Sequence, residues 1–297
     1  MSRKKEESNL INLLIIFPTL LYLILIGIIN ALIPNSWKPK KDVKGKVVLI
    51  TGAGQGLGRL YALQFANLKS NLILWDINRE NLKKVSKECE MKNVNVSYQV
   101  VDVSDKEEIY KAANKVLKDK GCVDILINNA GILFGKEFLE SSDENFEKMM
   151  KVNTFSHWYT LKAFLPDMIR RRKGHIVSMC SISSFAGTPW GVDYATSKFG
   201  TIGIMESIRN ELKMKNIFEI KTTIIAPTFT RTAMIDNFKI SKGRESLAPE
   251  DVVSQAMEAI LTEQSILIMP KLLYFLYYLK GILPTAAYDH IIINSLT

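Results

Sequence analysis

A tyrosine and a lysine stand four positions apart, Tyr194 and Lys198, in the segment Tyr-Ala-Thr-Ser-Lys. On a helix, residues four apart lie on one face, so the ammonium group would lie beside the phenol. A phenol with an ordinary pKa of about 10 is a poor base unless a positive charge stabilises its phenolate. The spacing therefore favours a proton acceptor and donor for hydride transfer at an alcohol, and the alternative is a solvated pair on a helix surface.

Three glycines, Gly52, Gly56 and Gly58, follow the apolar run Val47–Ile50 and precede a stretch typical of a helix, residues 59–68. Glycines at such a turn let the chain turn tightly, let a pyrophosphate approach the backbone N–H groups, and let the helix lie close to the sheet. The spacing differs from the common G-x-G-x-x-G pattern. The glycines alone therefore leave an ordinary strand–helix loop open.

Asp76 ends a second apolar run, residues 71–75, and Asp102 and Asn128 end later strand-like segments. Ligands in parallel sheets lie beyond the carboxyl ends of the strands, where all three side chains would meet. An acid roughly twenty residues after the glycines bonds the ribose hydroxyls of a dinucleotide and repels a 2′-phosphate. This predicts NAD rather than NADP, although Arg79 lies close enough in the sequence to weaken the preference.

Together, these motifs resemble those of the classical short-chain dehydrogenases/reductases. The resemblance covers roughly residues 46–270 and rests on four motifs in the expected order: Thr51-Gly-x-x-x-Gly-x-Gly58, Asn128-Asn-Ala-Gly131, Val152-Asn153 and Tyr194-x-x-x-Lys198. The family implies an α/β fold, namely a Rossmann-like, doubly wound and mostly parallel seven-stranded sheet. Cofactor and substrate would then be bound within one domain.

The resemblance also assigns roles. Tyr194 would be the catalytic acid or base, Lys198 would lower its pKa and hold the ribose, and Asn153 would anchor a water that relays the proton. The family places a serine thirteen residues before the tyrosine, which selects Ser181 as the catalytic residue that bonds the reacting substrate oxygen. The neighbouring Ser183 and Ser184 would be ordinary loop caps.

The expected cofactor contacts lie in the glycine turn, at the strand ends and in the catalytic segment: Thr51, Gly52, Gly56, Leu57, Gly58, Asp76, Asp102, Asn128, Ala130, Gly131, Tyr194, Lys198 and Thr232. The contact from Thr232 is the least defined, because Pro227-Thr228 replaces the Pro-Gly usual in the family. The three histidines show no ligand spacing, so no metal site is expected.

Near the N-terminus, Leu10–Ile33 is a run of 24 residues dominated by Leu and Ile. As a helix it would extend about 36 Å, enough to cross a hydrocarbon core of about 30 Å. Pro18 leaves both a kinked span and a hairpin in one leaflet open. A signal peptide, with an apolar core of about 7 to 15 residues, fits less well, so we expect an N-terminal membrane anchor.

The chain divides on this basis into four parts: an N-terminal tail and membrane anchor (1–36), a basic linker (37–45), an NAD-binding domain (46–270) and an apolar C-terminal segment (271–297). The last part contains the aromatic stretch Leu272–Leu279, for which an interfacial helix and an oligomer contact, such as that of a homodimer, are both open.

Basic residues concentrate around the apolar N-terminal segment, and the whole chain carries a net charge of +9. A basic collar against anionic lipid headgroups explains this charge more simply than nucleic acid does, so a membrane partner is expected and no nucleic acid. The lysines that follow the segment favour a catalytic domain on the cytosolic side. Three scattered cysteines, Cys89, Cys122 and Cys180, agree with a reducing compartment.

Within the family, the N-terminal segment, the pair Arg59-Leu60 and the strings Leu74–Asn78, Lys162–Pro166 and Met269–Phe275 resemble the 16C branch, which includes retinol dehydrogenases and is related to membrane-bound 17-beta-hydroxysteroid dehydrogenases. The resemblance implies a lipophilic alcohol as substrate, all-trans-retinol first, and the endoplasmic reticulum or lipid droplets as location. A steroid dehydrogenase is the second reading. A membrane or lipid-droplet surface protein without catalysis is the third.

The substrate pocket is expected to be apolar. The loop Phe229–Leu247 would line it together with Phe185, Trp190 and Val192. Apolar linings discriminate weakly between a polyene alcohol and a sterol, so the sequence alone leaves the substrate open.

Overall fold

The computed structural model describes residues 16–29, 33–34, 37–235 and 246–296. The chain forms two compact units, Met1–Lys40 and Lys41–Thr297. The boundary falls inside the expected basic linker, 37–45, and the apolar C-terminal segment belongs to the same unit as the dinucleotide-binding part.

The first unit contains a helix over residues 16–29. The expected anchor, Leu10–Ile33, extends beyond this helix at both ends, and residues 10–15 and 30–32 of it lie outside the described residues. Within the described part of the chain, no helix is long and apolar enough to cross a membrane.

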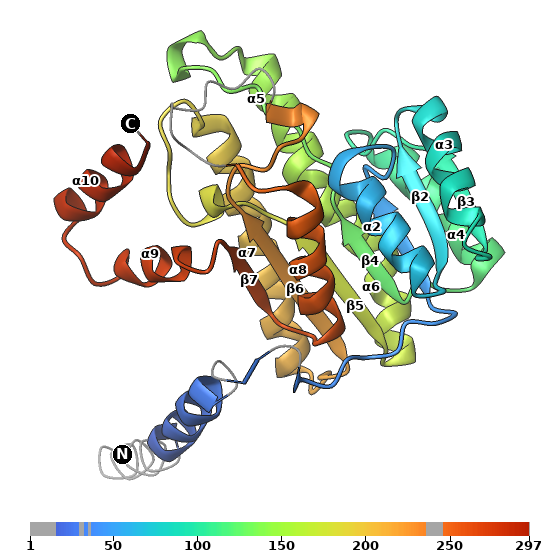
Figure 1. The fold of residues 1–297 in the computed structure, drawn as a ribbon, viewed down its shortest axis with the longest axis horizontal. Coiled ribbons are helices and arrows are strands. Elements are labelled where there is room, and N and C mark those ends of the chain that lie inside the picture. Colours follow the sequence, from blue (N-terminus) through green and yellow to red (C-terminus); the bar gives the residue numbers. More distant parts are fainter. Residues whose placement is uncertain (1–15, 30–32, 35–36, 236–245, 297) are drawn as a thin grey trace, which may run out of the picture. The chain divides into compact units, whose positions relative to one another are not determined.

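The second unit is built on one seven-stranded sheet with the strand order β3-β2-β1-β4-β5-β6-β7 (Figure 1). All six strand pairings are parallel. The strands are β1 (Val47–Thr51), β2 (Asn71–Asp76), β3 (Val96–Val100), β4 (Ile125–Asn128), β5 (Gly174–Met179), β6 (Ile220–Pro227) and β7 (Ile266–Met269). The expected Rossmann-like, parallel seven-stranded sheet is confirmed.

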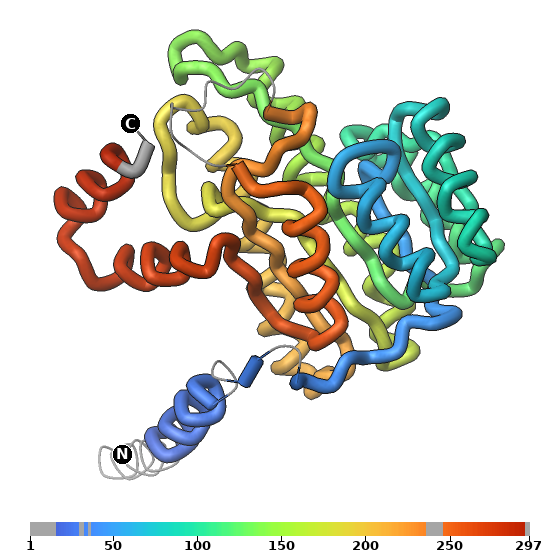
Figure 2. The backbone as a smooth tube through the Cα atoms, viewed as in Figure 1, coloured from blue at the N-terminus to red at the C-terminus, as the bar shows by residue number. Residues whose placement is uncertain are grey.

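Helices cover both faces of the sheet, as the tube in Figure 2 also shows. One face packs against α2 (Gly56–Asn67), α3 (Arg79–Glu90) and α8 (Pro249–Leu261), and the other against α4 (Lys106–Lys120), α6 (Ser156–Arg171) and α7 (Val192–Met214). Strand residues alternate between the two cores: Val48 and Ile50 join the first, and Leu49 joins the second. Burial on both faces explains why the strands are apolar almost without interruption.

The helices show matching local signals. In α4, the buried residues Ile109, Ala112, Ala113 and Val116 recur at the spacing of one helix face. The side chain of Asp105 caps its N-terminus, and Gly121 ends it in the left-handed conformation with φ of 77°. Such signals fix the helix length, and with it the places where the connecting loops return to the sheet.

The strand order changes direction between β1 and β4, because β1 pairs with β2 on one side and with β4 on the other. Ligands in doubly wound sheets bind at the carboxyl ends of such a pair. The glycine turn after β1 and the Asn-Asn-Ala-Gly segment after β4 meet there.

Two helices follow the last strand, α9 (Leu273–Leu279) and α10 (Thr285–Leu296). The Tyr274 hydroxyl fixes α9 to β7, since it donates to the Ile266 carbonyl at 2.9 Å and accepts from the Ile268 N–H at 3.1 Å. Tyr288 and Ile292 of α10 form a small buried cluster with Ala186. Short elements complete the unit: η2 (Phe138–Glu140), α5 (Asp143–Met150), the π-helical turn η3 (Lys151–Phe155), η4 (Ile182–Ser184) and η5 (Ala233–Ile235).

Candidate active site

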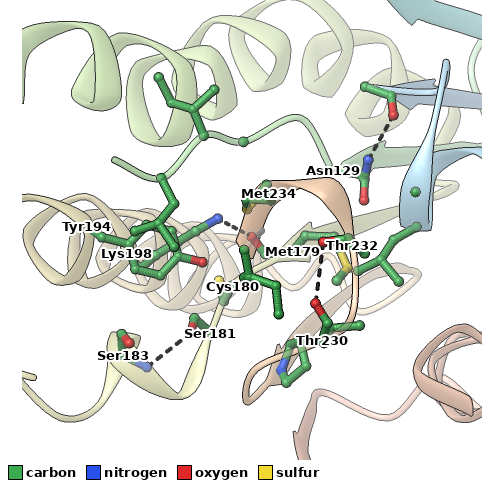
Figure 3. Close-up of a pocket in the computed structure, with 18 of the residues that line it drawn as sticks. Asn129, Met179, Cys180, Ser181, Ser183, Tyr194, Lys198, Thr230, Thr232 and Met234 are labelled. Atoms are coloured by element: carbon green, nitrogen blue, oxygen red, sulfur yellow. Dashed lines mark hydrogen bonds between the residues drawn. The ribbon is translucent and has the colours of Figure 1, made fainter. Parts of the chain in front are cut away.

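A cavity of about 760 Å³ lies over the carboxyl ends of the strands. Its walls come from the glycine turn, the ends of β2, β4 and β5, the start of α7, the loop after β6 and the two C-terminal helices. Figure 3 shows the catalytic side chains and the loop after β6 facing this space.

Tyr194 and Lys198 lie side by side on α7, as their spacing predicts (Figure 3). The Lys198 Nζ is 5.6 Å from the centre of the Tyr194 ring and donates a hydrogen bond to the Met179 carbonyl at 2.8 Å. Lys198 is almost fully buried. The solvated-pair alternative is therefore wrong, because the ammonium group lies inside the protein and bonds the end of β5.

Ser181 lies just beyond β5 and begins the short helix η4. Its Oγ accepts a hydrogen bond from the Ser183 N–H at 3.2 Å, and Ser184 returns a bond by accepting from the Ser181 N–H at 3.2 Å. This capping box fixes the backbone of Ser181. Ser181 and Ser183 line the cavity and Ser184 does not, so the structure supports the capping role of Ser184.

The pKa of Tyr194 is raised to about 12, because burial disfavours the phenolate. A hydrogen bond with Ser181 acts in the opposite direction, and the Cys180 thiol adds to the rise. Loss of hydration sets the direction of this shift, and the expected opposite effect of the Lys198 charge stays a prediction. Burial also lowers the pKa of Lys198. The phenol therefore holds its proton at neutral pH and can donate it.

Asn153 occupies the π-helical turn between α5 and α6, an irregularity common at functional sites. Its Oδ1 accepts from the Ile132 N–H at 2.8 Å, and its Nδ2 donates to the Ile132 carbonyl at 2.9 Å and to the Ser197 Oγ at 3.0 Å. Asn153 thus joins the segment after β4 to the helix that carries Tyr194. It is fully buried and does not itself line the cavity, and its role in a proton relay stays a prediction.

The glycine turn is shaped by close contacts. A Cβ on Gly58 would lie 2.0 Å from the Gly52 carbonyl oxygen, and one on Gly52 would lie 2.9 Å from the Ala130 Cα. Gly52 and Gly56 also have positive φ values, 64° and 53°. Only glycine fits here without moving the backbone, so α2 can begin directly at the cavity wall.

The N-terminus of α2 is suited to a phosphate. Gln55 caps the helix without a side-chain hydrogen bond, and the first turn carries no acidic residue. The first turn therefore brings no carboxylate of its own to its backbone N–H groups, and the N–H groups at a helix N-terminus bind anions. Gly52, Gln55, Gly56 and Leu57 all line the cavity. The turn thus fits the pyrophosphate of a dinucleotide.

Asp76 lies at the end of β2 and lines the cavity. Its two carboxylate oxygens accept from the Gly54 N–H at 2.8 Å and the Asn78 N–H at 2.9 Å. Each carboxylate oxygen has a further lone pair for a ribose hydroxyl. Asp102 lines the same region, and its Oδ1 accepts from Ser104. Asp76 therefore both shapes the glycine turn and faces the cofactor side of the cavity.

Three expected cofactor residues lie behind the cavity wall. Thr51 and Gly58 do not line the cavity, although the Thr51 Oγ1 accepts from the N–H groups of Asn129 and Ala130 at 3.0 and 3.1 Å. Asn128 points away, buried, and accepts from the Thr160 hydroxyl at 2.9 Å. These residues support the turn instead of touching the ligand space.

Asn129 takes the place expected for Asn128. It lines the cavity, and its Nδ2 donates to the carbonyls of Thr51 and Gly52 at 3.0 and 3.2 Å (Figure 3). Neighbouring residues of a strand point to opposite faces, so only one of the two asparagines can face the ligand. The Asn-Asn pair was a signal for the site, but the sequence alone did not distinguish its members.

Of the residues expected to line the pocket, Phe185, Trp190 and Val192 do not line this cavity. Phe185 packs against Tyr277 with ring centres 4.8 Å apart, the Trp190 Nε1 donates to Glu137 at 3.2 Å, and Val192 lines a separate surface groove. The described start of the loop 229–247 does line the cavity, including Thr232, whose methyl group faces Gly56. Residues 236–245 lie outside the described residues.

The sequence did not reveal the contribution of the C-terminal helices. Leu273, Leu276 and Ile292 line the cavity, and Met234 lies opposite Gly131. The apolar end of the cavity is therefore closed by residues far along the chain from the catalytic segment. In the described part of the chain, no cluster of three or more His, Cys, Asp or Glu side chains is arranged to hold a metal ion.

Comparisons with known proteins agree with this geometry. The family model of the short chain dehydrogenases matches residues 46–242. Human epidermal retinol dehydrogenase 2 is 45% identical over 269 residues, which cover 89% of this chain and 85% of that protein. Human estradiol 17-beta-dehydrogenase 11 is 40% identical over 275 residues, which cover 93% and 90% of the two chains.

The fold has solved counterparts as well. A short-chain dehydrogenase/reductase from Burkholderia phymatum in complex with NAD superimposes with a TM-score of 0.75, over 82% of this chain and 95% of that one, at 23% identity. The likeness concerns the fold alone at that identity. The family match covers more than half of the chain and includes the glycine turn, Asn153, Tyr194 and Lys198. The chain belongs to the short-chain dehydrogenase family, as the motifs of its sequence predict.

Proposed function

We propose that the protein oxidises a lipophilic alcohol, all-trans-retinol first, with NAD as hydride acceptor. The observation that carries this proposal is a single cavity with a polar catalytic end, formed by Ser181, Tyr194 and Lys198, and an apolar end, formed by residues such as Leu273 and Leu276. Two relatives of high identity, named for retinol and for estradiol, support a lipophilic substrate.

In this proposal, the hydroxyl of the substrate lies between Ser181 and Tyr194. When bound, NAD would supply the nicotinamide carbon that accepts the hydride, and its oxidised form would carry a positive charge that is lost on reduction. Tyr194 accepts the hydroxyl proton of the alcohol when its phenolate is stabilised, and in the reverse direction it donates that proton to the carbonyl oxygen. Lys198 lies 5.6 Å from the centre of the ring and provides a second positive charge for that stabilisation.

The test is the formation of NADH by membranes that contain the protein, with all-trans-retinol and with estradiol as substrates. The proposal expects a higher kcat/KM for retinol. A higher kcat/KM for estradiol would make the protein a steroid dehydrogenase, the second reading. No NADH with either alcohol, in membranes that bind NAD, would favour the non-catalytic surface protein.

For the cofactor, we expect Asp76→Ala to raise the KM for NAD and to reduce the preference for NAD over NADP. The carboxylate faces the cavity and repels a 2′-phosphate, and its loss also frees the Gly54 N–H. The kcat/KM for NAD should decrease by about tenfold or more, since a hydrogen bond to a charged group contributes about 1.5–3 kcal/mol. Steady-state kinetics with both cofactors provides the measurement. A wild-type enzyme more efficient with NADP would show that Arg79 or another cation governs this end of the site.

We further propose that the protein is bound to the membrane of the endoplasmic reticulum, or to lipid droplets, with its catalytic domain in the cytosol. Support comes from the apolar run Leu10–Ile33 and from the lysines that follow it. A second apolar surface lies in the C-terminal part, where Leu272, Phe275, Tyr278 and Ile282 are exposed.

Deletion of residues 1–34 is expected to release the protein from membranes only in part. The deleted run holds most of the apolar area, at about 25 cal/mol per Å², and the exposed C-terminal residues provide the remaining attachment. Fractionation with salt and with carbonate measures the release. A wholly soluble truncated protein would assign the C-terminal surface to an oligomer contact, and glycan on Asn95, in the sequon Asn-Val-Ser, would contradict the cytosolic orientation.

A further inference from the structure

The catalytic cavity has to hold two molecules. Its volume of about 760 Å³ extends from Asp76, on the cofactor side, to Ile292 of α10. Sites for one small molecule typically measure about 300–1,000 Å³. A dinucleotide along Gly52, Gly56 and Asp76 would take a large part of this space. The space left around Tyr194 is therefore short for a long apolar alcohol.

A second hollow adjoins the cavity. This outer groove has a volume of about 690 Å³ and lies between the start of α7 and α10. Its lining is mostly apolar and consists of Gly187, Thr188, Pro189, Val192, Ala195, Thr196, Phe199, Asp289, Ile292 and Ile293. Thr188 and Ile292 line both hollows. One layer of side chains thus forms the boundary between the catalytic cavity and the outer groove.

The helix at this boundary packs against the segment that follows β5. Tyr288 and Ile292 are the buried apolar residues of α10, in a cluster with Ala186. The Tyr288 hydroxyl is buried and finds no hydrogen-bond partner in the described part of the chain. Burial of an unpaired hydroxyl opposes the apolar gain of the ring, so Tyr288 stabilises this contact less than its burial alone indicates.

Lys280 holds the start of this region in place. Its Nζ donates to the Phe185 carbonyl at 2.8 Å and lies 4.7 Å from the centre of the Phe199 ring. Phe199 is a wall of the outer groove. The lysine therefore ties the connection between α9 and α10 to the segment after β5 and to α7, which fixes this side of the groove.

We propose that the substrate site continues past Thr188 and Ile292 into the outer groove, and that the groove binds the distal apolar part of a long primary alcohol whose hydroxyl lies at Tyr194. This inference rests on the proposed function and adds that the enzyme selects its substrate by length. The two side chains that the hollows share, Thr188 and Ile292, and the apolar lining of the outer groove carry the argument.

The test uses alcohols that share one reacting end and differ only in length: prenol, geraniol, farnesol and geranylgeraniol. Dissociation constants are measured with the full chain in membranes, in the presence of NADH, so that the cofactor site is filled and the alcohols are not oxidised. Thr196 is exposed, lines only the outer groove, and can be changed to Trp to fill it. Ser207→Trp is the matched control, because Ser207 is exposed on the same helix and lines neither hollow.

In the wild type and in Ser207→Trp, each isoprene unit beyond geraniol is expected to tighten binding by at least about tenfold, which burial of roughly two of its five carbons provides. In Thr196→Trp, this gain should be lost while the affinity for prenol stays close to that of the control. Equal gains in Thr196→Trp and Ser207→Trp would overturn the groove assignment, since partition into the membrane is the same for both. Length-dependent binding without NADH formation from any of the four alcohols would refute the proposed function and leave the groove assignment standing.

Discussion

Tyr194→Phe is expected to lower kcat by about a thousandfold, the scale of a lost general acid or base. The phenol lies in the cavity, interacts with Ser181 and is the group expected to accept the hydroxyl proton of the alcohol; burial raises its pKa to about 12, so this step depends on stabilisation of the phenolate. Phenylalanine keeps the ring, and with it the contact with the Lys198 ammonium at 5.6 Å. The measurement is single-turnover NADH formation, which separates chemistry from product release.

The affinity for NAD is the internal control for this variant. The glycine turn and Asp76 lie on other elements and keep their contacts, so the dissociation constant of NAD should be almost unchanged. Wild-type turnover in Tyr194→Phe would show that another group handles the proton. A large loss of NAD affinity would show that the variant disturbs the cavity as a whole.

Lys198→Ala is expected to impair both rate and cofactor binding. The substitution removes the ammonium group beside Tyr194 and leaves the Met179 carbonyl at the end of β5 without its donor. An unpaired buried acceptor costs about 1–3 kcal/mol, so the protein should also lose thermal stability. We expect a decrease in kcat of about a hundredfold, together with a higher KM for NAD.

The pH dependence distinguishes an electrostatic from a purely structural role of Lys198. Without the positive charge, the phenolate of Tyr194 is stabilised less, and the pKa of the phenol rises further above its ordinary value. The rate of alcohol oxidation, which needs the deprotonated form, should therefore reach its plateau at a higher pH in Lys198→Ala than in the wild type. Lys198→Arg retains the charge and should restore the pH profile more fully than the rate. An unchanged profile in Lys198→Ala would leave the lysine only a positioning role.

The local parts of the site could be predicted from the sequence. The turn between β1 and α2, the acid at the end of β2 and the pair on α7 each depend on residues within a few positions of one another. Strand-end and helix-face rules act over such short ranges. The same rules led to the parallel seven-stranded sheet, since apolar runs alternate with amphipathic segments along the chain.

Other features could not be predicted because they depend on contacts between distant segments. Asn129 faces the cavity and Asn128 does not, because the residue at which β4 ends decides which of the two side chains faces the cavity. Leu273, Leu276 and Ile292 replace Phe185 and Trp190 as apolar lining, because α9 and α10 fold back onto the loop after β5. No periodic pattern in the sequence indicates that these two helices pack against that loop.

By itself, then, the sequence determined the chemistry of the protein: a dinucleotide turn, an acid for the ribose, and a tyrosine with its lysine, each set by the spacing of neighbouring residues. Only the tertiary structure decided how deeply these catalytic groups are buried and which residues form the walls of the substrate space. Burial is a property of the whole fold, and it raises the pKa of Tyr194, an effect that the spacing of neighbouring residues does not contain. The shape of the substrate space is likewise set by α10, a helix about one hundred residues along the chain from Tyr194. Tertiary packing places this helix beside the cavity, although the two segments are distant in the sequence.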